Sequence, residues 1–259
     1  GRQKRIEYVS TFGVPQMHPA LGTAGEDADV RRIAAETPLR DGYAAGYGAS
    51  KWASEVLLRE AHDHFGLPVT VYRPDMIMAH SSYRGQLNVP DMFTRLIYSL
   101  ALTGIAPASF YDDPAAQVHY DGMPVDFLAA AMCRIGEQPW HGYRTYNTIS
   151  SHLDDGISLD TVAGWLESAG VALQRVPDHA DWFHRFADKL RHLPDEQRHA
   201  SALPILGYVE HPFPARGSSV RNEAFVEAVG ALEAGLKVPS LSEAYIHKYL
   251  DDLRVLGML

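Results

Sequence analysis

Residues 47–51 read Tyr47-Gly48-Ala49-Ser50-Lys51, and this stretch decides both the fold and the chemistry that the sequence predicts. The tyrosine and the lysine stand four positions apart, and in a helix such positions share one face at a separation of about 6 Å. The stretch leads into an apolar stripe made of Ala49, Ala53, Val56, Leu57, Ala61 and Phe65. This spacing predicts an amphipathic helix with Tyr47 and Lys51 in its first turns.

A short strand is predicted upstream of this helix. Residues 5–9, Arg5-Ile6-Glu7-Tyr8-Val9, have strand character and end in the hydroxyl pair Ser10-Thr11. Ligands of open α/β sheets bind at the carboxyl ends of the strands. Thr11 is therefore predicted to lie at the edge of a sheet where a substrate could reach it.

These three residue types suit the addition of hydride to a carbonyl group. The carbonyl oxygen becomes an oxyanion, which needs hydrogen-bond donors and a source of a proton. A phenol has a pKa of about 10, and a nearby ammonium favours the phenolate and lowers that value. Thr11, Tyr47 and Lys51 are therefore predicted as catalytic residues. The pentapeptide by itself is explained more readily by an exposed tyrosine and a solvated lysine on an ordinary helix, so its context carries the prediction.

The rest of the chain predicts an α/β fold, a partial Rossmann-like doubly wound parallel sheet followed by a mainly helical lobe. Gly66-Leu67-Pro68 ends the first helix, and the β-branched run at 69–72 is the next strand. Helix followed by such a strand is half of a doubly wound unit. Further elements are predicted at 91–103, 124–135, 143–149, 158–169, 181–192, 220–234 and 242–256. Residues 1–150 are predicted as the sheet domain with an inserted lid at about 81–116, and residues 151–259 as the helical lobe.

Composition narrows the class of protein. The chain has 259 residues, 46% of them hydrophobic, and a formal net charge of −9, which argues against general affinity for nucleic acid or anionic membranes. Its single cysteine, Cys133, cannot form an internal disulfide. No apolar run approaches the roughly 18 residues of a membrane span, so a cytoplasmic protein is expected. The histidines lack an established metal-ligand spacing, and no metal is predicted.

The sequence resembles the extended short-chain dehydrogenase/reductases, and more closely the thioester reductase domain at the C-terminal end of carboxylic acid reductases. The residues that carry the resemblance span almost the whole chain in family order: Tyr8-Val9-Ser10-Thr11, residues 46–55, residues 71–80, residues 83–95, residues 119–127 and residues 247–254.

This resemblance implies NADPH-dependent reduction of a phosphopantetheine-bound acyl thioester to an aldehyde, on a carrier domain of the same polypeptide. Thr11, Tyr47 and Lys51 take the family's catalytic roles. The implied cofactor-binding residues are Tyr47, Lys51, Pro74, Asp75 and Met76. The implied substrate-binding residues are Ser10, Tyr83, Arg84, Asn88 and Phe93. Asp75 is a further hypothesis: a carboxylate beside the nicotinamide could influence whether aldehyde is reduced again to alcohol, although a loop or capping aspartate explains it equally well.

One departure from the family is large. Such a domain should begin with a strand and a glycine-rich turn that holds the cofactor pyrophosphate, and no such motif precedes Tyr8. We therefore interpret the chain as the C-terminal part of a longer polypeptide, and the chain alone could be inactive. Two alternatives stay open: a sugar-nucleotide epimerase or dehydratase of the same superfamily, and a non-catalytic fragment that docks the carrier domain.

Overall fold

The computed structural model describes residues 4–17, 25–31, 45–150, 152, 155–215, 220–232 and 236–259. These residues form two compact units, each built from separate segments of the chain. The first unit comprises residues 1–77, 121–151 and 218–239, and the second comprises residues 78–120, 152–217 and 240–259. Much of the predicted surface excursion at 15–42 lies outside the described residues.

A parallel sheet of three strands forms the centre of the first unit. Its order is β1 (Ile6–Val9), β2 (Val69–Tyr72) and β6 (Tyr143–Tyr146), with Ile6 opposite Val69 and Val69 opposite Tyr143. Strand β2 is buried along its whole length, as a central parallel strand should be. The predicted strands at 5–9, 69–72 and 143–149 therefore pair in one sheet.

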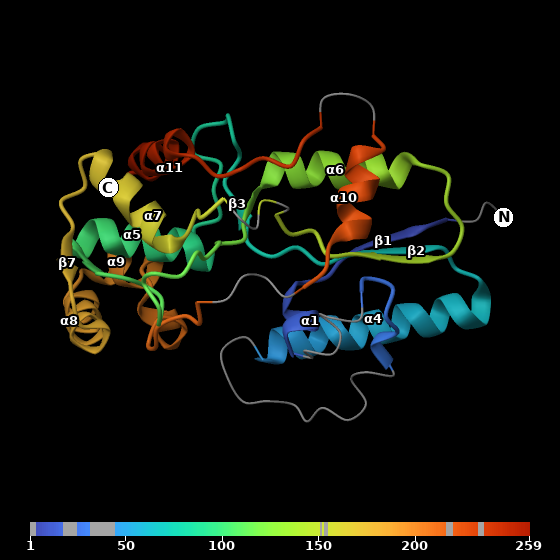
Figure 1. The fold of residues 1–259 in the computed structure, drawn as a ribbon, viewed down its shortest axis with the longest axis horizontal. Helices are drawn as coiled ribbons and strands as arrows, with labels where there is room; N and C mark the ends of the chain where they lie inside the picture. The colour runs from blue at the N-terminus through green and yellow to red at the C-terminus, as the bar shows by residue number, and fades with distance from the viewer. Residues whose placement is uncertain are drawn as a thin grey trace. The chain divides into compact units, whose positions relative to one another are not determined.

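Helices cover both faces of this sheet (Figure 1). On one face lie α1 (Gly13–Met17) and α4 (Ala45–Phe65); on the other lie α6 (Val125–Glu137) and α10 (Glu223–Gly230). Helix α4 ends at Gly66, whose φ of +63° is the left-handed conformation that glycine adopts readily. This arrangement confirms the predicted doubly wound, Rossmann-like α/β fold.

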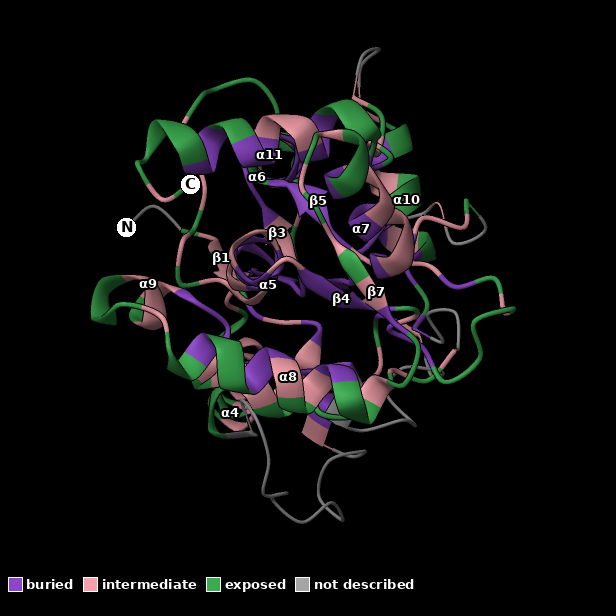
Figure 2. Cartoon of the chain, turned by 90° about the vertical axis from the view of Figure 1, so that its left-hand side faces the viewer, coloured by how far each residue is buried: buried purple, intermediate pink, exposed green. Residues whose placement is uncertain are grey.

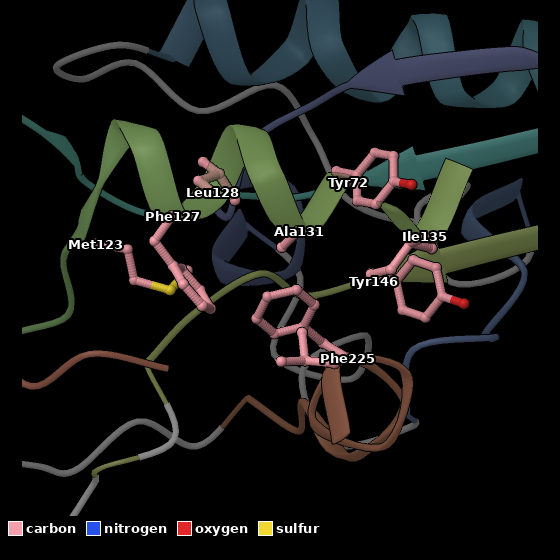
Figure 3. Close-up of a cluster of buried hydrophobic side chains, with 9 residues drawn as sticks. Tyr72, Met123, Phe127, Leu128, Ala131, Ile135, Tyr146 and Phe225 are labelled. Carbon is pink, nitrogen blue, oxygen red and sulfur yellow. The ribbon is translucent and has the colours of Figure 1, made fainter. Parts of the chain in front are cut away.

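The main core of the first unit lies between α6, α10 and the sheet (Figure 3). Tyr72 of β2 and Tyr146 of β6 stack with ring centroids 5.7 Å apart. Phe225 and Val229 of α10 are buried in the same cluster, which also contains Met123, Phe127, Leu128, Ala131 and Ile135. Met123 belongs to the short strand β5 (Met123–Pro124), which leads into α6. The chain leaves the first unit at β3 (Ile77–Met78).

The second unit is mainly helical. Its helices are α5 (Met92–Thr103), α7 (Leu159–Ser168), α8 (His179–Arg191), α9 (Asp195–Ala200) and α11 (Glu243–Val255), with a 3₁₀ segment at Leu203–Tyr208. Trp182 of α8 is fully buried; it stacks on Phe186 at 4.9 Å and meets the edge of Phe110 at 5.6 Å. Figure 2 shows buried and exposed positions alternating along α8, as expected for an amphipathic helix.

The unit boundaries differ from the two consecutive domains that the sequence predicts. The segment predicted as a lid, about 81–116, falls within the second unit, where its strand β4 (Ile105–Pro107) pairs with β7 (Gln174–Val176). Asp160 also accepts hydrogen bonds from the Ser109 hydroxyl and the Phe110 amide, at 2.6 and 2.8 Å. Conversely, residues 218–239 return to the first unit, where α10 completes the core beside α6.

Candidate active site

The carboxyl end of β1 presents Thr11, as predicted. The sheet ladder continues past the strand, because the Ser10 amide donates to the Tyr72 carbonyl at 2.6 Å and the Phe12 amide to the Pro74 carbonyl at 2.8 Å. Thr11 is partly exposed, and its hydroxyl oxygen accepts a hydrogen bond from the Gly13 amide at 3.2 Å. That bond leaves the hydroxyl proton available for a ligand oxygen.

The first turns of α4 hold Tyr47 and Lys51 together. Tyr47 is 53% exposed, so its phenol ring is accessible to a ligand. The ammonium of Lys51 lies 5.6 Å from the centroid of that ring and 5.1 Å from the centroid of the Tyr8 ring. It also donates a hydrogen bond to the Val9 carbonyl at 2.9 Å. The lysine therefore links α4 to the residue that comes just before the Ser10-Thr11 pair.

The carboxyl end of β2 contributes the segment Pro74, Asp75 and Met76. These three residues line a small pocket at the same edge of the sheet, together with Gly122, Met123, Leu128, Thr148 and Ile149. The predicted cofactor-binding residues thus fall into two groups, Tyr47 with Lys51 on α4 and the segment 74–76 after β2.

Thr148 is a residue of this pocket that the sequence analysis missed. Its side chain is fully buried, and its hydroxyl has no hydrogen-bond partner among the described residues. A buried hydroxyl without a partner is costly, unless a ligand or water supplies the missing bond. The signal that could have found it is its position two residues after β6, at the edge where parallel strands end.

A buried ion pair lies behind the predicted catalytic residues, and the sequence analysis also missed it. Glu55 of α4 and Arg73 after β2 are 0% and 1% exposed, and the guanidinium donates to both carboxylate oxygens. The Ser10 hydroxyl donates a hydrogen bond to the same carboxylate at 2.5 Å. Because Ser10 is only 2% exposed and directed at Glu55, its location does not support the predicted contact with substrate.

The other predicted substrate-binding residues belong to the second unit. Tyr83, Arg84 and Asn88 are exposed there, and Tyr83 stacks on His80 with ring centroids 4.0 Å apart. Phe93 is fully buried between Tyr120 and Tyr249, at centroid distances of 5.4 and 5.5 Å. This burial in the core of the unit does not support the predicted contact of Phe93 with substrate.

Two further observations concern the described part of the chain. Within it, no group of three or more histidine, cysteine, aspartate or glutamate side chains could hold a metal ion. None of the helices in the described ranges is both long and apolar enough to cross a bilayer.

Comparison with known proteins gives consistent similarities. The family model described as Male sterility protein, an NAD-binding model, matches residues 1–132. A carboxylic acid reductase from Mycobacterium marinum is 50% identical over 99% of this chain, and one from Mycobacterium tuberculosis is 47% identical over 100% of it. The chain spans 22% and 23% of these two relatives, about a fifth of their length.

Among solved structures, the reductase domain of a non-ribosomal peptide synthetase from Mycobacterium tuberculosis is similar to this chain. The TM-score is 0.87 and the sequence identity 41%; the match covers 99% of this chain and 61% of that one.

Proposed function

Since this chain belongs to the NAD-binding family described as Male sterility protein, we propose that it reduces an acyl thioester to an aldehyde with NADPH. The observation that carries the proposal is the Lys51 ammonium, which lies beside the Tyr47 ring and bonds to the strand that presents Thr11. The similarity to carboxylic acid reductases supports the choice of an acyl group as substrate.

The described residues fit a nicotinamide cofactor. Tyr47 is accessible, and the segment 74–76 lines a small pocket together with Thr148, whose buried hydroxyl has no hydrogen-bond partner within the described part of the chain. When bound, NADPH would supply hydride to the acyl carbonyl carbon.

The roles of the chain's own residues follow from charge development in the transition state. The Thr11 hydroxyl and the Tyr47 phenol would donate hydrogen bonds to the carbonyl oxygen as it becomes negative. Lys51 would place its positive charge beside the Tyr47 phenol and hold the cofactor ribose with its ammonium. Collapse of the tetrahedral species then breaks the carbon–sulfur bond and releases thiol and aldehyde.

The thioester donor is proposed to be a phosphopantetheine arm on a carrier domain of the same polypeptide. The matched relatives are much longer than this chain, which leaves room for such a domain in them. The exposed residues Tyr83, Arg84 and Asn88 are proposed to contact the arm or the acyl chain.

The test uses the full-length polypeptide loaded with an acyl group, with NADPH consumption and aldehyde formation followed together. Tyr47→Phe is expected to lower kcat by about 10²- to 10⁴-fold, the usual contribution of a general acid, while NADPH affinity stays unchanged. Tyr208→Phe, in the second unit, is the matched control and should retain full activity. Full activity in Tyr47→Phe would exclude the proposed mechanism.

Cofactor choice is tested separately by titration with NADPH and with NADH, using quenching of the four tryptophans as the signal. Tighter binding of NADPH is expected. Equal affinity for both cofactors would contradict the proposed preference for NADPH. It would not contradict the proposed reduction of the thioester.

A further inference from the structure

We propose that Glu55 and Arg73 are positioning residues, which hold the catalytic end of α4 in register with the carboxyl ends of β1 and β2. This inference rests on the proposed function, since it assigns a catalytic consequence to the alignment. Neither residue is predicted to touch cofactor or substrate, and both side chains are buried.

The contacts connect three segments through one carboxylate. Glu55 Oε1 accepts from the Ser10 hydroxyl at 2.5 Å and from Arg73 Nε at 3.0 Å. Glu55 Oε2 accepts from Arg73 Nη2 at 2.5 Å. The bidentate geometry fixes the orientation of both planar groups, which a single hydrogen bond does not do.

Each of the three residues in this cluster, Ser10, Glu55 and Arg73, lies close in the sequence to a proposed functional residue. Glu55 follows Lys51 by four positions and Tyr47 by eight, so the three side chains lie along one face of α4. Ser10 comes directly before Thr11, and Arg73 comes directly before the segment 74–76. A displacement of the carboxylate would therefore shift three groups of proposed functional residues relative to one another.

The backbone around Arg73 restricts its freedom further. Its amide donates to the Tyr146 carbonyl at 2.8 Å, and its carbonyl accepts from the Thr148 amide at 3.1 Å. Arg73 thereby also connects the Glu55 carboxylate to the segment after β6, which contains Thr148.

Stability alone is a weak reason for such a pair. Two buried charges lose their hydration, and replacing both with apolar side chains of similar size is often neutral or stabilising. Removing only one partner leaves an unpaired buried charge and is strongly destabilising. A double replacement therefore separates the alignment role from a role in folding.

The decisive variant is the double replacement Glu55→Met/Arg73→Met in the full-length polypeptide. We expect a thermal midpoint close to that of the wild type and a kcat lower by about 10²-fold, the loss that a misplacement of about 1 Å can cause. The control Glu167→Met/Arg175→Met removes a more exposed ion pair of the second unit and should leave kcat unchanged. A folded Glu55→Met/Arg73→Met variant with wild-type kcat would overturn the inference.

A milder variant covers the case in which the double replacement does not fold. Ser10→Ala removes only one hydroxyl and leaves the ion pair intact, whereas Ser10→Thr keeps a hydroxyl. We expect kcat to fall by about 10-fold in Ser10→Ala, a fraction of the loss that misplacement can cause, and to recover in part in Ser10→Thr. Equal kcat in wild type and Ser10→Ala would contradict the alignment role.

Hydrogen exchange supplies a readout that does not depend on turnover. If the carboxylate aligns the segments, amides at residues 6–13 and 45–55 should exchange faster in Ser10→Ala, while amides of α8 keep their wild-type rates. Unchanged exchange in both segments would overturn the inference. Absence of thioester reduction in the wild type would instead reject the proposed function, and the exchange measurement would still decide the alignment.

Discussion

Lys51 donates a hydrogen bond from its ammonium to the backbone carbonyl of Val9, and 2.9 Å separates the two atoms. This contact crosses from the first turns of α4 to the end of β1, so the lysine's position depends on two elements. The same ammonium lies 5.6 Å from the Tyr47 ring centroid. The Lys51 side chain therefore lies beside Tyr47, the proposed proton donor, and is hydrogen-bonded to β1, the strand that presents Thr11.

Lys51→Met is expected to lower kcat by about 10²-fold or more, because a fixed positive charge near the developing oxyanion is lost. It should also weaken NADPH binding, since the proposed contact with the ribose is removed. Steady-state kinetics and NADPH titration measure the two effects. Lys51→Arg keeps the charge and should retain more activity; a Lys51→Met enzyme with more than half the wild-type kcat would refute the assigned role.

Asp75→Gly is expected to raise the fraction of alcohol among the products. Asp75 lines the pocket beside Pro74 and Met76, and loss of its side chain should relax the placement of the nicotinamide, so that free aldehyde is accepted as a second substrate. Product analysis by chromatography gives the aldehyde-to-alcohol ratio. Asp113→Gly, an exposed loop position of the second unit, is the control, and equal ratios in all three proteins would end the hypothesis.

Glu26 should make the stability of the first unit depend on pH. Burial raises the pKa of its carboxyl from 4.5 to about 7, against the opposing effect of the amides of Asn147, Ala224 and Phe225. Between these values the folded state holds a proton that the unfolded state releases, so this contribution to stability is present below pH 4.5 and is lost as the pH rises through about 7.

The corresponding variant is Glu26→Gln, which cannot ionise. Relative to the wild type, it should gain up to about 3 kcal/mol of unfolding free energy between pH 4.5 and pH 7.5, since one pKa unit corresponds to about 1.4 kcal/mol. Urea unfolding across this range measures the difference. A constant difference at all pH values would show that folding does not raise the pKa of Glu26.

Trp182→Ala is expected to destabilise the second unit by about 3–5 kcal/mol, the usual cost of deleting a buried aromatic side chain. The ring is 0% exposed and contacts Phe110 and Phe186. Chemical unfolding measures the change, and Val255→Ala, at a position that is 59% exposed, should alter stability by no more than about 0.5 kcal/mol. A loss below about 1 kcal/mol in Trp182→Ala would show that this core tolerates the cavity.

Local sequence pattern was enough to predict the helix and strands that carry the proposed catalytic residues. The helix that follows Tyr47, the β-branched strand at 69–72 and the capped helix after Asp91 all occur close to their predicted bounds. Asp91 accepts from the Phe93 and Thr94 amides, as a helix N-cap does. The comparisons also confirm the resemblance to the reductase domain of carboxylic acid reductases.

The sequence by itself therefore determined the α/β class, the parallel sheet and the placement of Tyr47 and Lys51 on one helix face, because helix and strand periodicities are local properties of the chain. Only the tertiary structure decided which residues are buried together. It paired Glu55 with Arg73 across 18 positions, turned Ser10 inward, left Thr148 facing a pocket and assigned Phe93 to a core. Such contacts join residues far apart in the chain, and no local periodicity records them.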